Sequence, residues 1–463
     1  MMKTQEARST AAPVAIHVAE RGIRTRSGAW RCEIGENVEF STESLESYFF
    51  ARWEPVAYDA LLVAAAVEFA DRSRRRPAYT WQREFELRIP VHDTNRWNDP
   101  KVGEALRDSL GFLTGDRWHF EFYGRKKVMN APQQTNLSLP AGVEAVIPFS
   151  NGLDSRAVAG LMMREMGTKL VRVRLGSKLR EQEAISGHRE AFTSVPYNVK
   201  AGTQPFVESS ARSRGFKFAL ISALAAYLAD ASTVIVPESG QGALGPTLVP
   251  VGQAYEDYRS HPLFTGRMEI FLAALLDHRV RYSFPQLWYT KAETLRKFVD
   301  ECGDSAWSLT WSCWQQNRQS SVDHKKRHCG ICAACMLRRL SVHAAGLSEP
   351  KDTYVWEDLA ASTFPAGAAA SFDKKKITNA MHEYAIAGTL HLDHLAGLMD
   401  SAASKRMLDL NAFQLSGALA LPELDVRTRL GRLLRQHGTE WKHFMLSLGQ
   451  NSFVANWAVA GRP

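Results

Sequence analysis

The sequence has no apolar run long enough to cross a lipid bilayer. Its longest apolar stretch, Phe218–Ala229, ends at Asp230 and is shorter than the roughly 20 residues that a membrane-spanning helix needs. The N-terminal segment also lacks the succession of basic, long apolar and small residues that marks a secretory signal. We therefore expect a cytoplasmic protein without a membrane partner, in which Phe218–Ala229 forms a buried core helix.

Low-complexity segments and fixed-period repeats are also missing, which argues against a disordered chain or a repeat array. A chain of 463 residues is too long for a single core, so we expect two or three domains. The net charge of +8 is thinly spread and favours anionic partners, either nucleotide phosphates or nucleic acid. The basic run Arg72–Arg76 could contact nucleic acid, although such runs are usually solvated surfaces or loops.

Cysteines are scarce, since the chain has six, and most of them crowd into one segment. The clustered residues are Cys313, Cys329, Cys332 and Cys335. The three cysteines with C-x₂-C-x₂-C spacing and Cys313, fifteen intervening residues upstream, can complete a tetrahedral zinc site. Such a site leaves no position open to water or substrate, so the metal would be structural. The iron–sulfur alternative lacks the C-P that completes a ferredoxin motif. A disulfide framework would need an oxidising compartment, for which the chain has no targeting signal.

Three histidines lie close to these cysteines and could each replace one as a ligand. They are His324, His328 and His343. Because four cysteines already fill a tetrahedral site, solvated positions or positions beside the metal are favoured for them.

The chain divides by pattern into three segments. Residues 1–140 combine a helix expected over Tyr58–Ala70 with a strand expected over Trp118–Tyr123, which predicts an α+β extension. Between 141 and 350, short β-branched runs alternate with helical stretches, which predicts an α/β fold with a doubly wound parallel sheet. Residues 351–463 are mainly helical by pattern. Ligands of doubly wound sheets bind beyond the carboxyl ends of the strands, so the loops there are the candidates for chemistry.

A candidate phosphate loop follows the strand expected over Val143–Phe149. Its residues are Ser150, Asn151, Gly152, Leu153, Asp154 and Ser155. A strand, a loop of small residues and a helix start together present backbone N–H groups and the positive end of a helix dipole to an anion. The two serine hydroxyls add donors, and Asp154 is the natural Mg²⁺ ligand because a carboxylate beside phosphate needs a cation between them. The alternative is an ordinary helix capped after a turn.

This loop resembles the SGGxDS pyrophosphate loop of the N-type ATP pyrophosphatases, which adenylate carbonyl oxygens and release pyrophosphate; Asn151 replaces the first glycine. Together with the cysteines, the chain resembles one subfamily, the QueC enzymes, which make 7-cyano-7-deazaguanine from 7-carboxy-7-deazaguanine, ammonia and ATP. T-W-S-C-W at Thr310–Trp314 and C-G-I-C-A-A-C-M-L-R at Cys329–Arg338 resemble the two halves of that family's zinc site. T-K-A-E at Thr290–Glu293 resembles another of its signatures.

The resemblance implies a PP-loop fold over 141–350, with ATP, Mg²⁺ and structural Zn²⁺ as cofactors. The implied catalytic residues are Asp154, Lys291, Arg214 and Lys178. The implied substrate-binding residues are Glu238, Arg267 and Glu269. Ordinary alternatives stay open: Lys291 and Arg214 could be solvated charges. Glu238 could be a helix cap and Glu269 a salt-bridge partner.

Departures from biosynthetic QueC lie near the expected substrate pocket. Leu175–Lys178 replaces the family's Y-G-Q-R, and Gly215 replaces the asparagine after Arg214, so the base or the amine acceptor could differ. The N-terminal extension is foreign to that family and resembles the longer QueC-like proteins of anti-phage defence operons, such as the QatC type.

The implied activity is a C–N bond-forming ligation. The carboxylate of a 7-deazaguanine-like base is adenylated and then attacked by nitrogen, either from ammonia or from an amine of a partner protein. A catalytically degenerate subunit of a defence complex, binding nucleotide or nucleic acid without turnover, is the competing hypothesis.

Overall fold

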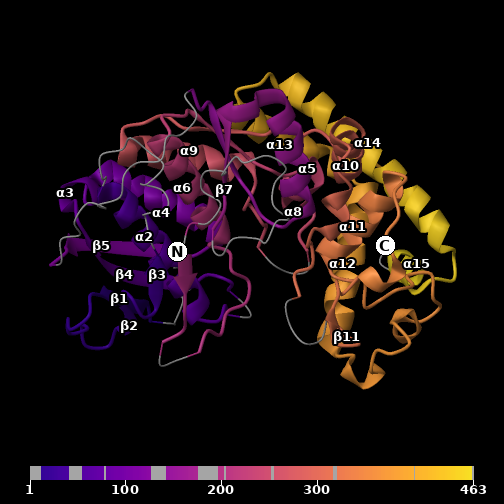
Figure 1. Cartoon of the computed structure of the whole chain (residues 1–463), viewed down its shortest axis with the longest axis horizontal. Helices are drawn as coiled ribbons and strands as arrows, with labels where there is room; N and C mark the ends of the chain where they lie inside the picture. The colour runs from indigo at the N-terminus through magenta and orange to yellow at the C-terminus, as the bar shows by residue number, and fades with distance from the viewer. Residues whose placement is uncertain are drawn as a thin grey trace, which may run out of the picture. The chain divides into compact units, whose positions relative to one another are not determined.

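The computed structural model describes most of the chain: residues 12–40, 55–77, 80–126, 142–175, 195, 197–202, 205–251, 255–315, 321–400 and 402–460 (Figure 1). These residues belong to two compact units. The first comprises residues 1–148, 168–234 and 264–282, and the second comprises 149–167, 235–263 and 283–463. The predicted domains were continuous segments with boundaries near residues 140 and 350, whereas each compact unit combines several segments. The predicted boundaries stay a prediction.

The first unit contains a four-stranded sheet with the order β2-β1-β4-β5. Its strands are β1 (Val14–Ala19), β2 (Trp30–Glu33), β4 (Glu84–Val91) and β5 (Arg117–Gly124). All three strand pairings are parallel. The associated helices are α2 (Pro55–Ser73), α3 (Thr94–Trp97) and α4 (Pro100–Thr114), and α2 is buried along most of its length. Helices lie between β2 and β4 and between β4 and β5, so this sheet has an α/β arrangement, whereas an α+β extension was predicted for residues 1–140.

A second sheet has the order β10-β9-β6-β7. Its strands are β6 (Ala145–Pro148), β7 (Leu170–Val173), β9 (Thr233–Ile235) and β10 (Arg281–Ser283). Strand β6 pairs in parallel with both β7 and β9. Helices α6 (Arg214–Leu228) and α9 (Pro262–Leu276) belong to the same unit, as does a small antiparallel pair of β3 (Val38–Phe40) and β8 (Tyr197–Val199). The predicted parallel sheet with helices is confirmed, and so is the buried helix expected after Phe218.

The second unit is mainly helical. Its α-helices are α5 (Leu153–Met166), α7 (Gly240–Ala243), α8 (Gly245–Leu248), α10 (Lys291–Cys302), α11 (Ala333–Ala344), α12 (Asn379–Gly397), α13 (Ala402–Leu419), α14 (Glu423–Leu448) and α15 (Phe453–Ala460). Short 3₁₀ turns cover Ser305–Leu309, Lys351–Thr353, Phe364–Gly367 and Lys374–Lys376, and a fifth, Gly167–Lys169, begins where α5 ends. The strands described in this unit are β11 (Ser321–Val322) and β12 (Lys325–Lys326), which pair antiparallel, together with the last residues of β9 and β10. The predicted helical C-terminal region is confirmed.

The apolar core of the second unit joins the cysteine segment to the C-terminal helices. Cys335 and Leu340 of α11 share one buried cluster with Leu392 of α12 and Trp441 of α14. These three helices contact one another pairwise and lie close together in Figure 1. The C-terminal helices therefore share the hydrophobic core of the residues that carry the sequence motifs.

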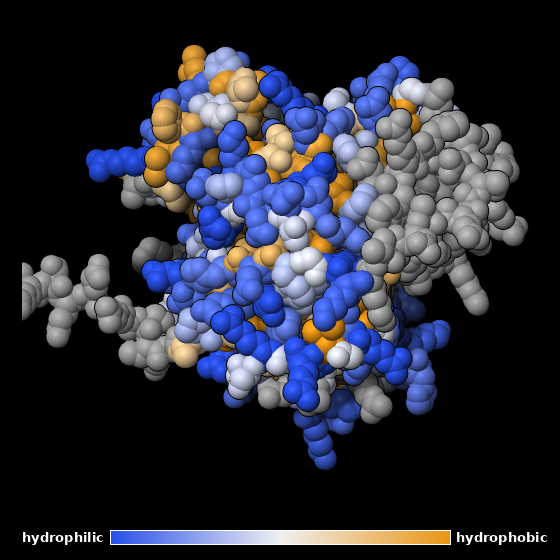
Figure 2. Space-filling model, turned by 90° about the vertical axis from the view of Figure 1, so that its left-hand side faces the viewer, coloured by the Kyte–Doolittle hydropathy of each residue, from blue (hydrophilic) through white to orange (hydrophobic). Residues whose placement is uncertain are grey.

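No helix in the described part of the chain combines the length and the apolar character needed to cross a bilayer. On the face shown in Figure 2, most coloured residues are hydrophilic and the apolar ones are scattered. Scattered apolar residues are normal on a protein surface and need no further explanation.

Candidate active site

The predicted phosphate loop connects β6 to α5. Ser150 Oγ and Ser155 Oγ lie 2.9 Å apart, and the Gly152 N–H donates a hydrogen bond to Ser150 Oγ at 3.2 Å. Gly152 is the N-cap of α5 and has an extended backbone, with φ −73° and ψ 154°. Asn151 is exposed and is not among the described residues with positive φ. In this conformation, neither residue 151 nor residue 152 has the left-handed backbone that would require glycine.

Close packing of α5 against α10 brings two charged side chains together. Asp154 lies in the first turn of α5, and Lys291 is the first residue of α10. A Cβ atom on Gly160 of α5 would overlap the ring of Phe298 of α10, so glycine at this position permits the close approach. Lys291 Nζ forms an ion pair with Asp154 Oδ2, and both side chains are largely buried. The structure thus pairs two of the predicted catalytic residues.

Glu238, which precedes α7, adds a second carboxylate to this pair. Burial, followed by repulsion from Asp154, raises the pKa of Glu238 well above its usual value, and Lys291 opposes the shift. Burial disfavours the charge of Lys291, but the two carboxylates raise its pKa, so it stays a cation near neutral pH. Asp154 Oδ1 is buried without a hydrogen-bond partner among the described residues.

This arrangement fits a divalent cation. Two carboxylates share one lysine in a largely buried place, so a bound cation would favour ionisation of Glu238, and Asp154 Oδ1 is an unused ligand atom. Carboxylate oxygens are ligands that Mg²⁺ prefers, and it commonly binds one or two of them together with substrate phosphates. Asp154 and Glu238 are therefore the residues that would hold the ion, and the assignment of Mg²⁺ stays a prediction.

Arg259 is a second cation at this cluster and was not predicted from the sequence. Burial opposes its charge, but Asp257, whose Oδ2 lies 2.8 Å from Arg259 Nε, and also Glu238 raise the pKa of Arg259. Its charge in turn opposes the upward shift of the pKa of Glu238. No motif marks Arg259, because a D-x-R sequence in a loop is common and its neighbour Glu238 is distant in the chain.

A capping box and the C-terminal helix α14 fix the start of α10. The Glu293 N–H donates to Thr290 Oγ1 at 3.1 Å, and the Thr290 N–H donates to the Glu293 carboxylate at 2.8 Å. Thr290 Oγ1 also donates to Glu440 Oε1 of α14 at 2.7 Å. Arg432, also of α14, forms an ion pair with Glu293. The T-K-A-E sequence is thus a capped helix start that α14 contacts through two of its four residues.

A second set of hydrogen bonds from α14 reaches the backbone of Lys291. The Lys291 N–H donates to Gln241 Oε1 at 2.8 Å, and Gln241 Nε2 lies 2.7 Å from His437 Nδ1. Burial lowers the pKa of His437 to about 4, so the ring is neutral near pH 7. The neutral ring then accepts from Gln241 at Nδ1 and donates from Nε2 to the Leu392 carbonyl, 2.9 Å away.

Two further predicted cations are not part of this cluster as described. Arg214 lies in the first compact unit, where it begins α6 as expected and sits over the ring of Phe218, 5.3 Å from its centroid. Lys178 lies outside the described residues. Their catalytic roles stay predictions.

The remaining predicted substrate-binding residues, Arg267 and Glu269, also belong to the first unit. Arg267 Nε pairs with Asp108 Oδ2 at 3.1 Å. The Tyr282 N–H donates to Glu269 Oε1 at 2.8 Å, and burial raises the pKa of Glu269. Both side chains therefore have local structural contacts, and their roles toward a substrate stay predictions.

The predicted zinc ligands come together in the second unit. Cys313, Cys329, Cys332 and Cys335 are all buried, and their sulfur atoms lie within 4.8 Å of one another. A tetrahedral zinc with Zn–S bonds of about 2.3 Å requires sulfurs about 3.8 Å apart. The sulfurs of Cys329 and Cys335 are 3.8 Å apart. Burial raises the pKa of both thiols, so ionising the group requires a compensating cation. The four cysteines fit a closed metal site.

Local backbone geometry supports this metal site. Gly330, between the first two cysteines of the C-x₂-C-x₂-C sequence, has φ 87°, and a Cβ there would press on the carbonyl of Trp356. Glycine is therefore required at this position. His328 packs against Trp311, with tilted rings whose centroids are 4.3 Å apart, and is not one of the four grouped ligands.

The cysteine segment also contacts the phosphate loop. Arg338, which ends the C-x₂-C-x₂-C-x₂-R sequence, is fully buried and donates to Thr310 Oγ1 at 2.7 Å and to Glu349 Oε1 at 2.6 Å. The next residue after Thr310 is Trp311, whose N–H donates to the Asn151 carbonyl at 2.7 Å. A structural metal in this segment would therefore also support the loop that precedes Asp154.

Residues 249–346 match the model of the family described as queuosine biosynthesis protein QueC. The matched stretch contains α9, α10, the four cysteines and α11. It includes Lys291, which begins α10, and Arg259, which precedes α9. The phosphate loop and Glu238 lie before it. No curated protein and no solved structure matches the chain significantly.

Proposed function

Because the chain is QueC-like, we propose that it is an ATP-dependent ligase that adenylates a carboxylate and releases pyrophosphate. The proposed fold is that of the PP-loop ATP pyrophosphatases. The observation that carries the proposal is the buried cluster of Asp154, Glu238 and Lys291, which directly adjoins the loop beginning at Ser150. The cluster combines carboxylate ligands for a cation with the fixed positive charge of Lys291. Both would stabilise the negative charge that develops on pyrophosphate as it leaves.

The phosphate loop can supply donors to the β and γ phosphates. The first turn of α5 has no side-chain cap, so its N–H groups can bind an anion. The hydroxyls of Ser150 and Ser155 bond to each other and can turn toward phosphate oxygens instead. Both kinds of donor belong to one short segment, which favours binding of a compact polyphosphate.

A carboxylate is a poor acyl donor, because its leaving group would be oxide. In the proposed reaction, a carboxylate oxygen attacks the α phosphorus, the bond from that phosphorus to the bridging oxygen breaks, and pyrophosphate leaves. Lys291 would offset the negative charge that develops on the bridging oxygen. Mg²⁺ held by Asp154 and Glu238 would neutralise charge on the departing pyrophosphate. The acyl adenylate then has AMP as its leaving group.

The proposed substrate is a 7-deazaguanine-like base, and the acceptor is ammonia or an amine of a partner protein. Carboxylate side chains suit the N–H donors of a guanine-like edge, which supports Glu269 as a base-binding residue and Arg267 as its neighbour. The long N- and C-terminal regions outside the matched stretch would suit docking of a protein from the same defence operon.

Product analysis tests this function. Purified protein with Mg-ATP and 7-carboxy-7-deazaguanine should release AMP and pyrophosphate, and Asp154→Asn should abolish release while zinc content and the circular dichroism spectrum stay unchanged. Addition of ammonium, or of a candidate partner protein, should shift the mass of the product. ADP as the sole nucleotide product would contradict the proposal.

The second candidate is a subunit that binds a nucleotide without turnover. One observation favours it: Asp154 is already paired with Lys291. This candidate predicts ATP binding in calorimetry with no AMP in the presence of any carboxylate tested.

A further inference from the structure

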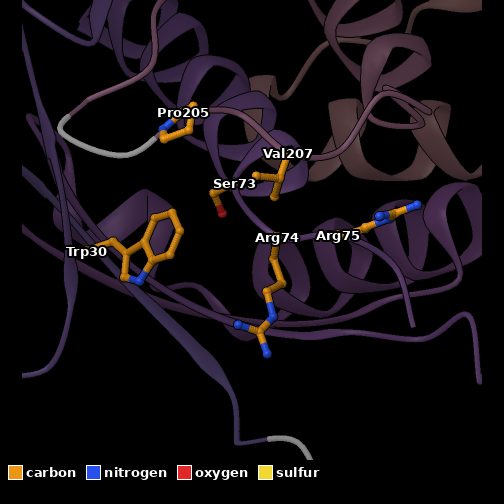
Figure 3. Close-up of a pocket in the computed structure, with 6 residues that line it drawn as sticks. All are labelled: Trp30, Ser73, Arg74, Arg75, Pro205 and Val207. Carbon is orange, nitrogen blue, oxygen red and sulfur yellow. The ribbon is translucent and has the colours of Figure 1, made fainter. Parts of the chain in front are cut away.

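An open cavity of about 870 Å³ lies in the first unit, at the C-terminal end of α2. Its lining residues come from three separate segments and are Trp30, Ser73, Arg74, Arg75, Pro205 and Val207. Figure 3 shows the Trp30 ring on one side, Arg74 beside it and Arg75 extending away from the indole. None of the lining residues is acidic, so the cavity combines flat and apolar walls with positive charge alone.

The first and last arginines of the Arg72–Arg76 run form contacts within the folded unit. Arg72 lies over the Phe206 ring, 4.0 Å from its centroid, and donates to the Val199 carbonyl at 3.3 Å. Arg76 is buried and pairs with Asp116 at 2.9 Å. The run is thus neither a uniform solvated surface nor a uniform binding patch.

The inner arginines of the run are different. Arg74 and Arg75 are exposed, and among the described residues neither side chain has a hydrogen bond or an ion pair. Val207, on the adjoining wall, is 52% exposed, which is high for a valine that covers a helix end. Its backbone N–H donates to the Arg72 carbonyl at 3.0 Å, so this wall is fixed to the end of α2. The cavity therefore holds two unneutralised cations beside a fixed apolar wall.

We propose that this cavity binds a nucleotide unit, with its base stacked on Trp30 and its phosphate paired with Arg74. An indole face accepts any base, and a guanidinium pairs with phosphate oxygens in a forked geometry. Arg75, at the rim, would contact a neighbouring phosphate when the unit is part of a single strand. An acidic peptide would satisfy the arginines and leave the indole unused. The proposal does not rest on the ligase function, because it involves none of the residues around Asp154.

Fluorescence anisotropy with the full chain tests this proposal. The probes are a fluorescein-labelled oligothymidylate and a labelled AMP, which distinguish a nucleic-acid strand from a free nucleotide as the source of the unit. Trp30→Ala and Arg74→Glu should each weaken binding by roughly tenfold or more, whereas Trp30→Phe should largely retain it. Arg74→Lys keeps the charge and loses the forked geometry, so it should weaken binding less than Arg74→Glu does. For the strand, Arg74→Glu should also reduce the slope of log K against log salt by about 0.7 per lost phosphate contact.

Arg107→Glu is the matched charge control, because Arg107 is exposed on α4 and does not line the cavity. It should leave affinity nearly unchanged. Equal affinity of wild type, Trp30→Ala and Arg74→Glu would overturn the proposal. So would binding that Asp154→Asn abolishes and Trp30→Ala leaves intact, since the nucleotide would then occupy the phosphate loop. Competition by a polyglutamate peptide as strong as that by unlabelled oligothymidylate would also overturn it.

Discussion

Glu238 is held where its charge is disfavoured, by burial and by the neighbouring Asp154. Such a group weakens the fold when it ionises, unless a cation compensates. Lys291 and Arg259 provide only part of that compensation, because the pKa of Glu238 remains raised in their presence. A residue kept under this cost is expected to have a function, and the proposed binding of a divalent cation together with Asp154 would explain it.

Glu238→Gln should raise the melting temperature at neutral pH without Mg²⁺. In the unfolded chain Glu238 has its ordinary pKa, so the folded state holds the proton more tightly, and wild-type stability falls as pH rises through the raised pKa. The difference between the proteins should vanish below about pH 4, where the carboxyl is protonated in both states. Thermal unfolding across pH would show this. Identical melting temperatures of the two proteins at neutral pH would contradict the account.

Mg²⁺ should raise the melting temperature of wild type and leave that of Glu238→Gln unaffected.

The pairing of α5 with α10 depends on the absence of a side chain at Gly160. Gly160→Ala should force the helices apart, at a cost of about 1–3 kcal/mol in the free energy of unfolding, and separate Asp154 from Lys291. Urea denaturation and the rate of AMP formation would both report it. Restoring the space with Phe298→Leu in the same chain should recover part of the activity. Full activity of Gly160→Ala alone would show that the helix spacing is unimportant.

Helix α14 contacts α10 through Glu440 and Arg432 and reaches Lys291 through His437 and Gln241. Glu440→Ala should lower kcat more than it raises KM, because the Thr290 hydroxyl loses its partner and the position of Lys291 loosens. Glu440→Gln keeps an acceptor oxygen and should restore the rate. Thr439→Ala, an exposed change on the same helix, is the control. Steady-state kinetics with equal kcat for Glu440→Ala and Thr439→Ala would refute the positioning role.

Short sequence motifs were sufficient to find the groups that the motifs themselves contain. The cysteine spacing identified the four grouped sulfurs, and the loop and the T-K-A-E sequence identified Asp154 and Lys291. Contacts between distant segments had no such signal: nothing in the sequence links Glu440 to Thr290. The parallel pairing of β4 with β5 was also missed, because side-chain alternation along a strand does not reveal the direction of its neighbour.

The whole second unit should depend on the metal proposed for its four cysteines. The cysteine segment shares a core with α12 and α14 and contacts the phosphate loop through Trp311. Removing zinc with a chelator should therefore lower the melting temperature and also abolish ATP binding, and added zinc should restore both. Metal analysis and calorimetry would establish the stoichiometry. Unchanged ATP affinity in the metal-free protein would show that the two sites are independent.

The most direct measurement for the proposed reaction is exchange of labelled pyrophosphate into ATP. Adenylation is reversible, so the protein should catalyse exchange only when Mg²⁺ and the carboxylate substrate are both present. Asp154→Asn and Lys291→Ala should abolish the exchange. If label failed to enter ATP while wild-type protein bound both ATP and the carboxylate, the adenylation assigned to this cluster would be contradicted.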